Sequence, residues 1–199
     1  MGVYENIYKI FEFQSGLIKT SDVLNKGISN YHLEKLVKEG KIEKIKRGYY
    51  QWKEGLEVNE AAFISKLFQE AIICMDSALF YYEYTDRTPK CWHIAVDKNT
   101  NKSKFNIKYP SIKVYYIDPK IIGLGITNEN IDGVMVKIYD RERVICDIIK
   151  YSNKIDKEIM NKAIQAYLND TQKNISKLVQ YAKILRVYKK LELLVGVWL

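Results

Sequence analysis

The stretch of residues 17–52 constrains the fold of this chain most, because cap and turn residues divide it into short elements. Apolar side chains at helical spacing predict a helix of residues 20–25, with Thr20 or Ser21 as its N-cap. A turn that contains glycine follows, and a second helix is predicted to continue to Glu39. Two short helices joined by a tight turn are typical of a helix-turn-helix.

The second of these helices is predicted to be amphipathic. Ser29 is its predicted N-cap, and Gly40 suits the left-handed conformation that ends a helix. The face that we expect to pack on the core consists of Leu33, Leu36 and Val37. The opposite face, which we expect to point outward, consists of Tyr31, Lys35 and Lys38.

A basic hairpin is predicted directly after this helix. Residues 41–45 and 49–52 are expected to pair as strands around the turn Lys46-Arg47-Gly48. Residues 35–53 hold seven basic and two acidic side chains, so positive charge gathers on the helix and the hairpin. This order of elements predicts a winged helix-turn-helix, a unit whose second helix enters a DNA groove.

The outward side chains of this unit are therefore candidates for DNA contact. The alternative is that these side chains form an ordinary solvent-exposed face with no DNA contact, since runs of charge usually lie in solvent. Arg47 is the strongest candidate on the wing, because its long cationic side chain at the hairpin tip can reach a phosphate or a minor groove. The predicted DNA-contact set is Thr20, Ser21, Ser29, Asn30, Tyr31, Lys35, Lys38, Lys46, Arg47 and Tyr49.

The remainder of the chain predicts a second domain of mixed secondary structure. A polar linker, residues 53–59, leads into a helix of about residues 58–70. Strands are expected at residues 71–74, 91–97, 112–117 and 133–139. Helices are expected at residues 77–84, 141–151, 157–169, 174–186 and 188–196. The predicted class is α+β: an N-terminal winged helix-turn-helix (1–56), then a small mixed α/β unit that ends in a C-terminal helical bundle (57–199).

The formal net charge of the 199-residue chain is +8, and it is spread unevenly. Residues 1–58 hold 10 basic and 8 acidic side chains, whereas residues 137–199 hold 13 and 7. The C-terminal helices are therefore predicted to carry a second basic patch, either a surface for RNA, DNA or an acidic protein, or a solvated face. The partner-binding candidates in it are Lys177, Lys183, Arg186, Lys189 and Lys190.

Several other classes of protein fit the sequence poorly. No apolar run approaches the roughly 18–20 residues of a membrane span, and the first residues lack the pattern of a secretory signal. Asn6 stands where a myristoylation signal needs serine or threonine. Cys74, Cys91 and Cys146 lack the spacing of a zinc site. We expect a cytoplasmic protein with reduced thiols and with no membrane association, metal or cofactor.

Signs of catalysis are few. Asp76-Ser77 lacks the glycine-flanked turn of a nucleophile, so Ser77 is predicted to cap a helix instead. Gly123-Leu124-Gly125 lacks the third glycine of a phosphate-binding loop. A cluster of carboxylates is interleaved with arginines, which favours an ion-pair network over a metal site. The cluster consists of Asp140, Arg141, Glu142, Arg143 and Asp147.

These landmarks together resemble a known family, the AbiEi-type antitoxins of bacterial abortive-infection systems. The resemblance of the N-terminal unit rests on Gly27-Ile28-Ser29, Leu33, Leu36-Val37, Gly40, Ile42 and Arg47-Gly48-Tyr49-Tyr50. Ser77-Ala78-Leu79 is similar to a helix start in the family. The segment from Asp140 to Arg143 with Asp147 resembles its Glu-Arg-Thr-x-x-Asp segment, with Val144 in the threonine position, and residues 182–194 resemble its last helices.

The resemblance implies a regulator of antiviral defence that is not an enzyme. Such antitoxins bind inverted repeats in double-stranded DNA upstream of their own operon and repress it. They oppose a nucleotidyltransferase-like toxin in a type IV toxin–antitoxin system, without necessarily forming a stable complex with it. Two other interpretations remain open: a nucleic-acid-processing enzyme that the winged helix targets, with Asp147 in its metal site, and an interaction scaffold that binds no DNA.

Overall fold

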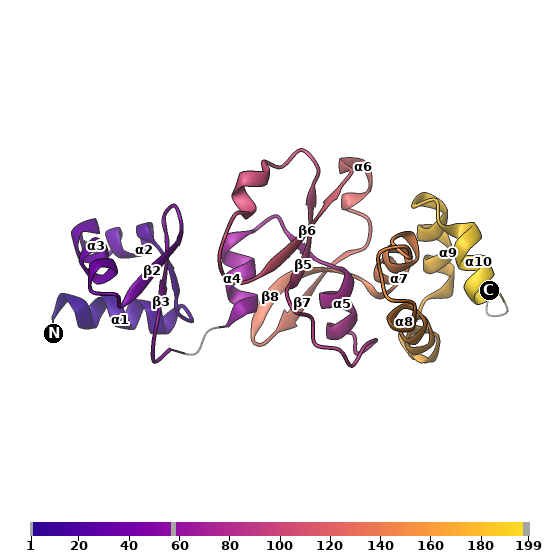
Figure 1. Cartoon of the computed structure of the whole chain (residues 1–199), viewed down its shortest axis with the longest axis horizontal. Helices are drawn as coiled ribbons and strands as arrows, with labels where there is room; N and C mark the ends of the chain where they lie inside the picture. Colours follow the sequence, from indigo (N-terminus) through magenta and orange to yellow (C-terminus); the bar gives the residue numbers. More distant parts are fainter. Residues whose placement is uncertain (1, 57–58, 197–199) are drawn as a thin grey trace. The chain divides into compact units, whose positions relative to one another are not determined.

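In the computed structural model, which describes residues 2–56 and 59–196, the chain divides into two compact units (Figure 1). The first unit comprises Met1–Leu67 and Asn106–Pro110, and the second comprises Phe68–Phe105 and Ser111–Leu199. The proposed domain boundary between residues 56 and 57 stays a prediction. The contacts place the helix that follows this boundary with the first unit.

The first unit combines short helices with a three-stranded sheet. Its helices are α1 (Val3–Phe13), α2 (Thr20–Leu24), α3 (Asn30–Lys38) and α4 (Glu60–Leu67). Its strands are β1 (Leu17–Lys19), β2 (Ile42–Lys46) and β3 (Tyr49–Trp52), which pair antiparallel in the order β1-β3-β2. The predicted winged helix-turn-helix is confirmed, with α2 and α3 as its helix pair and the hairpin β2–β3 as its wing.

One apolar core holds the winged helix together. Its buried side chains are Ile7, Ile10, Phe11, Ile18, Val23, Leu33, Leu36, Ile42 and Tyr50. Every element from α1 to β3 supplies at least one of them, so the helix pair and the wing are fixed to the same core. The ring of Trp52 packs edge-on against the rings of Tyr8 and Phe11, with centroids 5.0 and 5.2 Å apart.

Two details of the helix-turn-helix differ from the prediction. The N-cap of α2 is Lys19 and not Thr20 or Ser21, because the carboxylate of Asp22 accepts the main-chain N–H of Lys19 at 2.8 Å and starts the helix one residue earlier. Val37, which was predicted to face the core, is 37% exposed. The core contact of this short helix is confined to the stripe that carries the buried Leu33 and Leu36.

The predicted helix of residues 58–70 corresponds to α4. Its predicted start at Val58 lies outside the described residues, and α4 begins at Glu60. The helix ends at Leu67 because the chain turns there, with the N–H of Ala71 bonded to the carbonyl of Phe68 at 2.8 Å.

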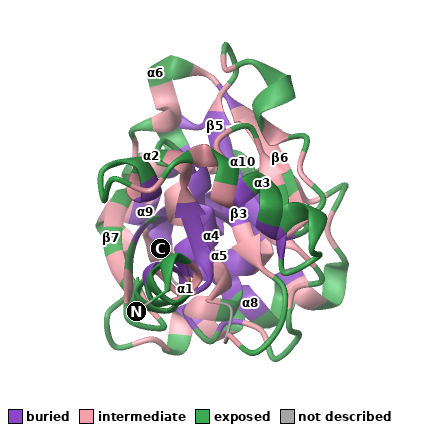
Figure 2. Ribbon diagram, turned by 90° about the vertical axis from the view of Figure 1, so that its left-hand side faces the viewer, coloured by how far each residue is buried: buried purple, intermediate pink, exposed green. Residues whose placement is uncertain are grey.

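The second unit is built on a five-stranded sheet in the order β6-β5-β4-β8-β7. The strands are β4 (Ile72–Ile73), β5 (Trp92–Asp97), β6 (Ile112–Ile117), β7 (Ile126–Ile131) and β8 (Val134–Tyr139). β4 pairs antiparallel with β5 and parallel with β8, β5 pairs parallel with β6, and β7 pairs antiparallel with β8. Four consecutive residues of β5, 93–96, are buried (Figure 2). The four predicted strands are confirmed as β4, β5, β6 and β8.

Several helices accompany this sheet. Between the strands lie α5 (Met75–Tyr81), the 3-10 turn η1 (Lys102–Phe105) and α6 (Pro119–Ile122). After the sheet come α7 (Arg141–Lys150), α8 (Lys157–Asn169), α9 (Ile175–Ile184) and α10 (Tyr188–Val195), which confirm the four predicted C-terminal helices. α8, α9 and α10 each contact α7. Residues 142–149 of α7 are all buried, so α7 is the central element of this helical part.

Three elements of the second unit differ from the prediction. β7 and α6 were not predicted: β7 alternates exposed and half-buried side chains at the edge of the sheet, so it has no apolar face. The predicted cap Ser77 lies inside α5, which begins at Met75 with Cys74 as its N-cap. The hydroxyl of Ser77 instead accepts the main-chain N–H of His93 at 2.9 Å.

Candidate nucleic-acid interface

Helix α3 exposes the three side chains that were predicted to face outward. Tyr31 is 65% exposed, and Lys35 and Lys38 are also exposed, whereas Leu33 and Leu36 beneath them are fully buried. The helix is thus anchored through its apolar stripe and presents two cations and a phenol on its free face. Contact of these three side chains with DNA stays a prediction.

The start of α3 lies where it was predicted. Ser29 is its N-cap residue, but its side chain makes no capping hydrogen bond. Asn30 donates from its side-chain amide to Glu34, one turn along α3, at 3.2 Å. The amide oxygen of Asn30 is buried and has no hydrogen-bond partner among the described residues. Of the predicted contacts at this end, Ser29 is exposed and Asn30 is half-buried.

The tip of the wing is tied to the start of α2. The main-chain N–H of Thr20 donates to the carbonyl of Gly48 at 2.9 Å. Gly48 has φ +78°, a conformation that glycine adopts readily and that closes the hairpin. The neighbouring Arg47 and Ser21 are exposed. The structure thus brings predicted contacts from α2 and from the wing tip next to each other.

Two other residues of the wing are occupied within the protein. The ammonium group of Lys46 donates to the main-chain carbonyl of Leu67 at 2.5 Å and lies 4.7 Å from the ring centroid of Tyr49. The hydroxyl of Tyr49 donates to the carbonyl of Lys66 at 3.3 Å. Both acceptors belong to the last turn of α4, whose carbonyls lack partners within the helix. The sequence offered no signal for this structural role of two predicted DNA contacts.

Lys66 completes this link from the other side. Its ammonium group donates to the main-chain carbonyls of Gln14 and Leu17, at 2.9 and 3.2 Å, in the turn between α1 and β1. Burial lowers the pKa of Lys66. The end of α4 is therefore fixed to both the wing and the α1–β1 turn of the first unit.

Two residues beside α3 were not predicted to belong to the interface. The ring of Tyr4, in α1, has the ammonium groups of Lys35 and Lys41 close to it. Because Tyr4 lies in the first helix and Lys41 just after the third, only the packing of α1 against α3 brings them together. A pattern of neighbours along the sequence could not have found this arrangement.

The C-terminal basic candidates fall into two groups. Lys177 is paired within the second unit: its ammonium group lies 2.9 Å from Asp140 and 3.5 Å from Glu142. Although burial opposes its charge, the hydrogen bond to Asp140 holds the pKa of Lys177 above its usual value. The other four lie around the corner between α9 and α10 and are exposed. They are Lys183, Arg186, Lys189 and Lys190.

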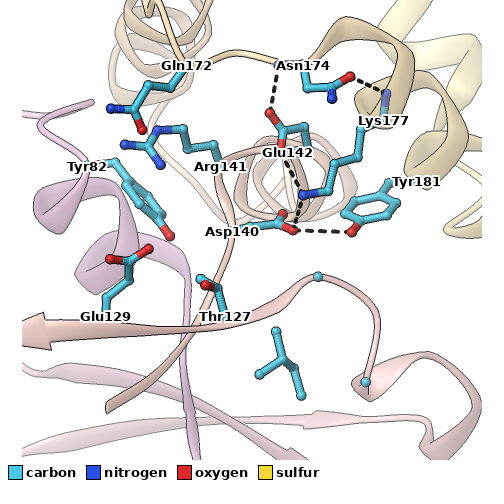
Figure 3. A pocket seen from close by; sticks show the side chains of 13 residues that line it. Tyr82, Thr127, Glu129, Asp140, Arg141, Glu142, Gln172, Asn174, Lys177 and Tyr181 are labelled. Atoms are coloured by element: carbon cyan, nitrogen blue, oxygen red, sulfur yellow. Dashed lines mark hydrogen bonds and ion pairs between the residues drawn. The ribbon is translucent and has the colours of Figure 1, made fainter. Parts of the chain in front are cut away.

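Lys177 lies in a polar cavity of about 450 Å³ (Figure 3). The hydroxyl of Tyr181 donates to Asp140 at 3.2 Å, and the main-chain N–H of Asn174 donates to Glu142 at 2.9 Å. Arg141, also on the wall, is held by Asp170 at 2.9 Å. The charged groups around Lys177 thus largely satisfy one another, which is what a structural ion-pair network requires.

The acidic cluster confirms the predicted network. Arg143 and Asp147 form a pair at 3.0 Å with side chains only 1% and 4% exposed. Arg143 also donates to the carbonyls of Ile121 and Leu124, both at 2.7 Å, and so holds the loop after α6. Burial raises the pKa of Asp147, against the opposing effect of Arg143. A carboxylate sequestered in this way is poorly placed to ligate a metal in contact with nucleic acid.

Other side chains that chemical sites often use are a buried histidine and three cysteines. His93 is buried beside Asp76, with Nε2 3.8 Å from a carboxylate oxygen, and burial lowers its pKa. Cys74, Cys91 and Cys146 are free thiols. Within residues 2–56 and 59–196, no three side chains of histidine, cysteine, aspartate or glutamate gather to hold a metal ion. No helix in the described part of the chain is long and apolar enough to cross a membrane.

Comparison with known proteins bears on the first unit and on the fold. The crystal structure of the RV2827C protein from Mycobacterium tuberculosis is similar, with a TM-score of 0.55 and 9% sequence identity over 98% of this chain and 80% of that chain. At this identity the similarity shows the fold alone. No curated protein matches the chain. Residues 5–51, which include most of α1, the helix pair and nearly all of the wing, match the protein family described as "Transcriptional regulator, AbiEi antitoxin".

Proposed function

We propose that this protein is a DNA-binding autorepressor that also acts as the antitoxin of an abortive-infection, type IV toxin–antitoxin pair. The match of residues 5–51 to a family of transcriptional regulators supports the regulatory role. The observation that carries DNA binding is the exposure of Tyr31, Lys35 and Lys38 on one face of α3, with the exposed Arg47 on the wing. A helix flanked by a cationic wing fits a DNA groove and its phosphates.

The proposed DNA target is the region upstream of the protein's own gene, at inverted repeats. Lysine and tyrosine side chains on α3 would meet base edges and phosphates, and Arg47 a phosphate or the adjacent minor groove. Lys46 and Tyr49, which hold α4, would contribute to DNA contact only by fixing the shape of the wing.

The antitoxin half of the proposal concerns the second unit. We propose that it opposes a nucleotidyltransferase-like toxin in the cytoplasm, without enzymatic chemistry of its own and without a cofactor. The enclosed Arg143–Asp147 pair supports a structural rather than a catalytic role for the acidic cluster. A nucleic-acid-processing enzyme would need that carboxylate free, so no observation favours this second function.

The repressor half is tested by a gel shift of the full chain on a duplex of its own upstream region. Binding should weaken steeply as salt rises, because phosphate contacts release counterions. The variant Lys35→Ala with Arg47→Ala should lose most of the shift. The matched control, Lys104→Ala with Lys120→Ala, removes the same charge from exposed positions of the second unit and should bind as the unchanged protein does. Equal shifts for both double variants would refute the proposed docking.

The antitoxin half is tested by growth rescue. Expression of the neighbouring nucleotidyltransferase-like gene should arrest growth, and co-expression of this protein should restore it. The Lys35→Ala, Arg47→Ala variant should still rescue when its expression is driven from an unrelated promoter, because the proposed counteraction of the toxin belongs to the second unit. Failure of the unchanged protein to rescue would remove the antitoxin role and leave the repressor role intact.

A further inference from the structure

The ring of Tyr4 has two lysine ammonium groups close to it. Nζ of Lys35 lies 5.2 Å and Nζ of Lys41 lies 5.7 Å from the ring centroid. Both distances are within the range of cation–π attraction. Lys35 comes from α3 and Lys41 from the residues just after it, so one aromatic side chain of α1 gathers two cations at the edge of α3.

Tyr4 is well suited to fix the position of Lys35. The ring is half-buried and packs against the core of the winged helix, and the ring of His32 lies edge-on to it with centroids 6.0 Å apart. The contact with the ring restrains the ammonium group of Lys35, although the lysine side chain itself is exposed to solvent. Its interaction with the neighbouring Tyr4 side chain also holds the pKa of Lys35 above the usual value.

One ion pair among the described residues involves either of these two lysines. Lys41 pairs with Glu39 at 3.2 Å, and both residues are exposed. Among the described residues, no carboxylate lies within 4 Å of the Lys35 ammonium group, so Glu39 balances only one of the two positive charges. Exposed ion pairs of this kind are weak and are readily exchanged for a stronger anion. The doubly charged edge of α3 is thus open to a phosphate group.

We infer that Tyr4 is a positioning residue that holds Lys35 and Lys41 together as a contact for a phosphate of the DNA backbone. The inference rests on the proposed DNA binding. It assigns the exposed side chains of α3 to two kinds of DNA contact, one with a phosphate and one with base edges. Lys35, drawn toward α1, serves the phosphate at the edge of the groove. Tyr31 and Lys38 on the same helix are left for the base edges.

Phosphate contacts and base contacts have different effects on measured DNA binding. A phosphate contact contributes to affinity for every duplex and to the dependence of binding on salt. A contact with a base edge contributes to the preference for one sequence over another. The two tasks are separated by titrating the full chain with two probes, the upstream duplex of its own gene and a scrambled duplex of the same composition, over a series of salt concentrations.

The test is a double-mutant cycle. Lys35→Gln with Lys41→Gln should lower the slope of log affinity against log salt by about 0.9, the value for one phosphate contact, equally on both probes. Tyr4→Leu should lower the slope in the unchanged protein but should have no further effect in the Lys35→Gln, Lys41→Gln background, because Tyr4 acts through these lysines. Tyr4→Phe keeps the ring and should lose less than Tyr4→Leu. Thermal melts establish that each variant is folded.

Lys9→Gln is the matched control. Lys9 lies on the same helix as Tyr4 and carries the same positive charge as Lys35 and Lys41. It pairs with Glu5 at 3.9 Å. Its replacement should leave the slope within about 0.5 of the original value, which separates local positioning from a general loss of charge.

Three results would overturn the inference while leaving the proposed repressor intact. The first is a slope unchanged by both replacements of Tyr4. The second is a further loss on Tyr4→Leu in the background without the two lysines. The third is a loss confined to the upstream duplex, which would make Lys35 a base contact. By contrast, an unchanged protein that does not prefer its own upstream duplex over the scrambled one would refute the proposed function itself.

Discussion

The ammonium group of Lys46 in the wing donates a hydrogen bond to the main-chain carbonyl of Leu67, at the end of α4. A wing residue that the sequence assigns to DNA thereby completes the end of a helix within its own unit. Since Tyr49 supplies the neighbouring donor to Lys66, the wing and α4 form one hydrogen-bonded structure. The wing is consequently more rigid than a free hairpin of the same length would be.

Lys46→Met should destabilise the first unit by about 1–2 kcal/mol, because it keeps the apolar stem but leaves a helix-end carbonyl without its charged donor. Urea unfolding followed by circular dichroism measures the change. Lys44→Met is the control on the same strand: Lys44 is exposed, and its replacement should not measurably change stability. Equal effects at the two positions would contradict the structural role of Lys46.

Gly125→Ala should destabilise the second unit by about 3 kcal/mol or more, because two costs combine. Gly125 has φ +79°, and a Cβ there would lie 2.6 Å from the Cβ of Arg143. Gly133 has φ +81° but no atom within 4 Å of a built Cβ, so Gly133→Ala should cost only the conformational part, about 1 kcal/mol. Thermal unfolding of the two variants side by side measures the difference, and comparable losses would show that the close approach is unimportant.

Arg143→Met should cost about 3–5 kcal/mol at neutral pH, because it leaves the buried carboxylate of Asp147 without its partner. Lys162→Met is the control. It breaks an ion pair of the same i,i+4 spacing that lies on the surface, with Glu158, and should have little effect.

The loss on Arg143→Met should also depend on pH. Burial already raises the folded-state pKa of Asp147 above its unfolded value, and removal of the arginine raises it further. Between the unfolded value, about 3.9, and the raised folded value, the native state binds more protons, so stability falls as pH rises through this window. The destabilisation by Arg143→Met, measured by urea unfolding, should therefore be smaller at pH 5 than at pH 8. A loss independent of pH would contradict the burial of an unpaired charge.

Leu36→Ala and Val37→Ala, adjacent on α3, should differ strongly. Leu36 is fully buried, so its truncation should cost about 2–5 kcal/mol. Val37 is 37% exposed, and its truncation should cost no more than about 0.5 kcal/mol. Chemical denaturation of the two variants measures both values. Similar losses would place Val37 in the core after all.

The helix-turn-helix was predictable because its signals are local. Helical spacing marks Leu33 and Leu36, and Gly40 ends the segment with φ +72°. The register of the caps was less predictable, because Lys19 becomes the N-cap through a hydrogen bond with Asp22 rather than through a preference of its own. The prediction that Val37 faces the core was wrong. A helical wheel gives the direction in which a side chain points, but it does not give the width of the helix surface that contacts the core.

The second unit was predictable where its strands are buried and not where they lie at an edge. The apolar residues Ile94 and Val96, which are buried in β5, predict a strand from the sequence. The polar side chains of β7 give little indication of a strand. The contact of Ser77 with His93 joins a helix to a strand, and the contact of Tyr4 with Lys35 joins two helices. Contacts of this kind depend on tertiary packing, which no spacing along the chain reveals.

The parallel pairing of Ile73 in β4 with Ile138 in β8 fixes the order in which a growing chain can fold. All elements of the winged helix have left the ribosome once Trp52 has emerged, and their contacts are local. The sheet of the second unit must wait for β8, so β4 and β5 emerge long before their last neighbour. During synthesis the winged helix is therefore complete first, and the unfinished sheet exposes unpaired strand edges, which favour aggregation, until β8 has emerged.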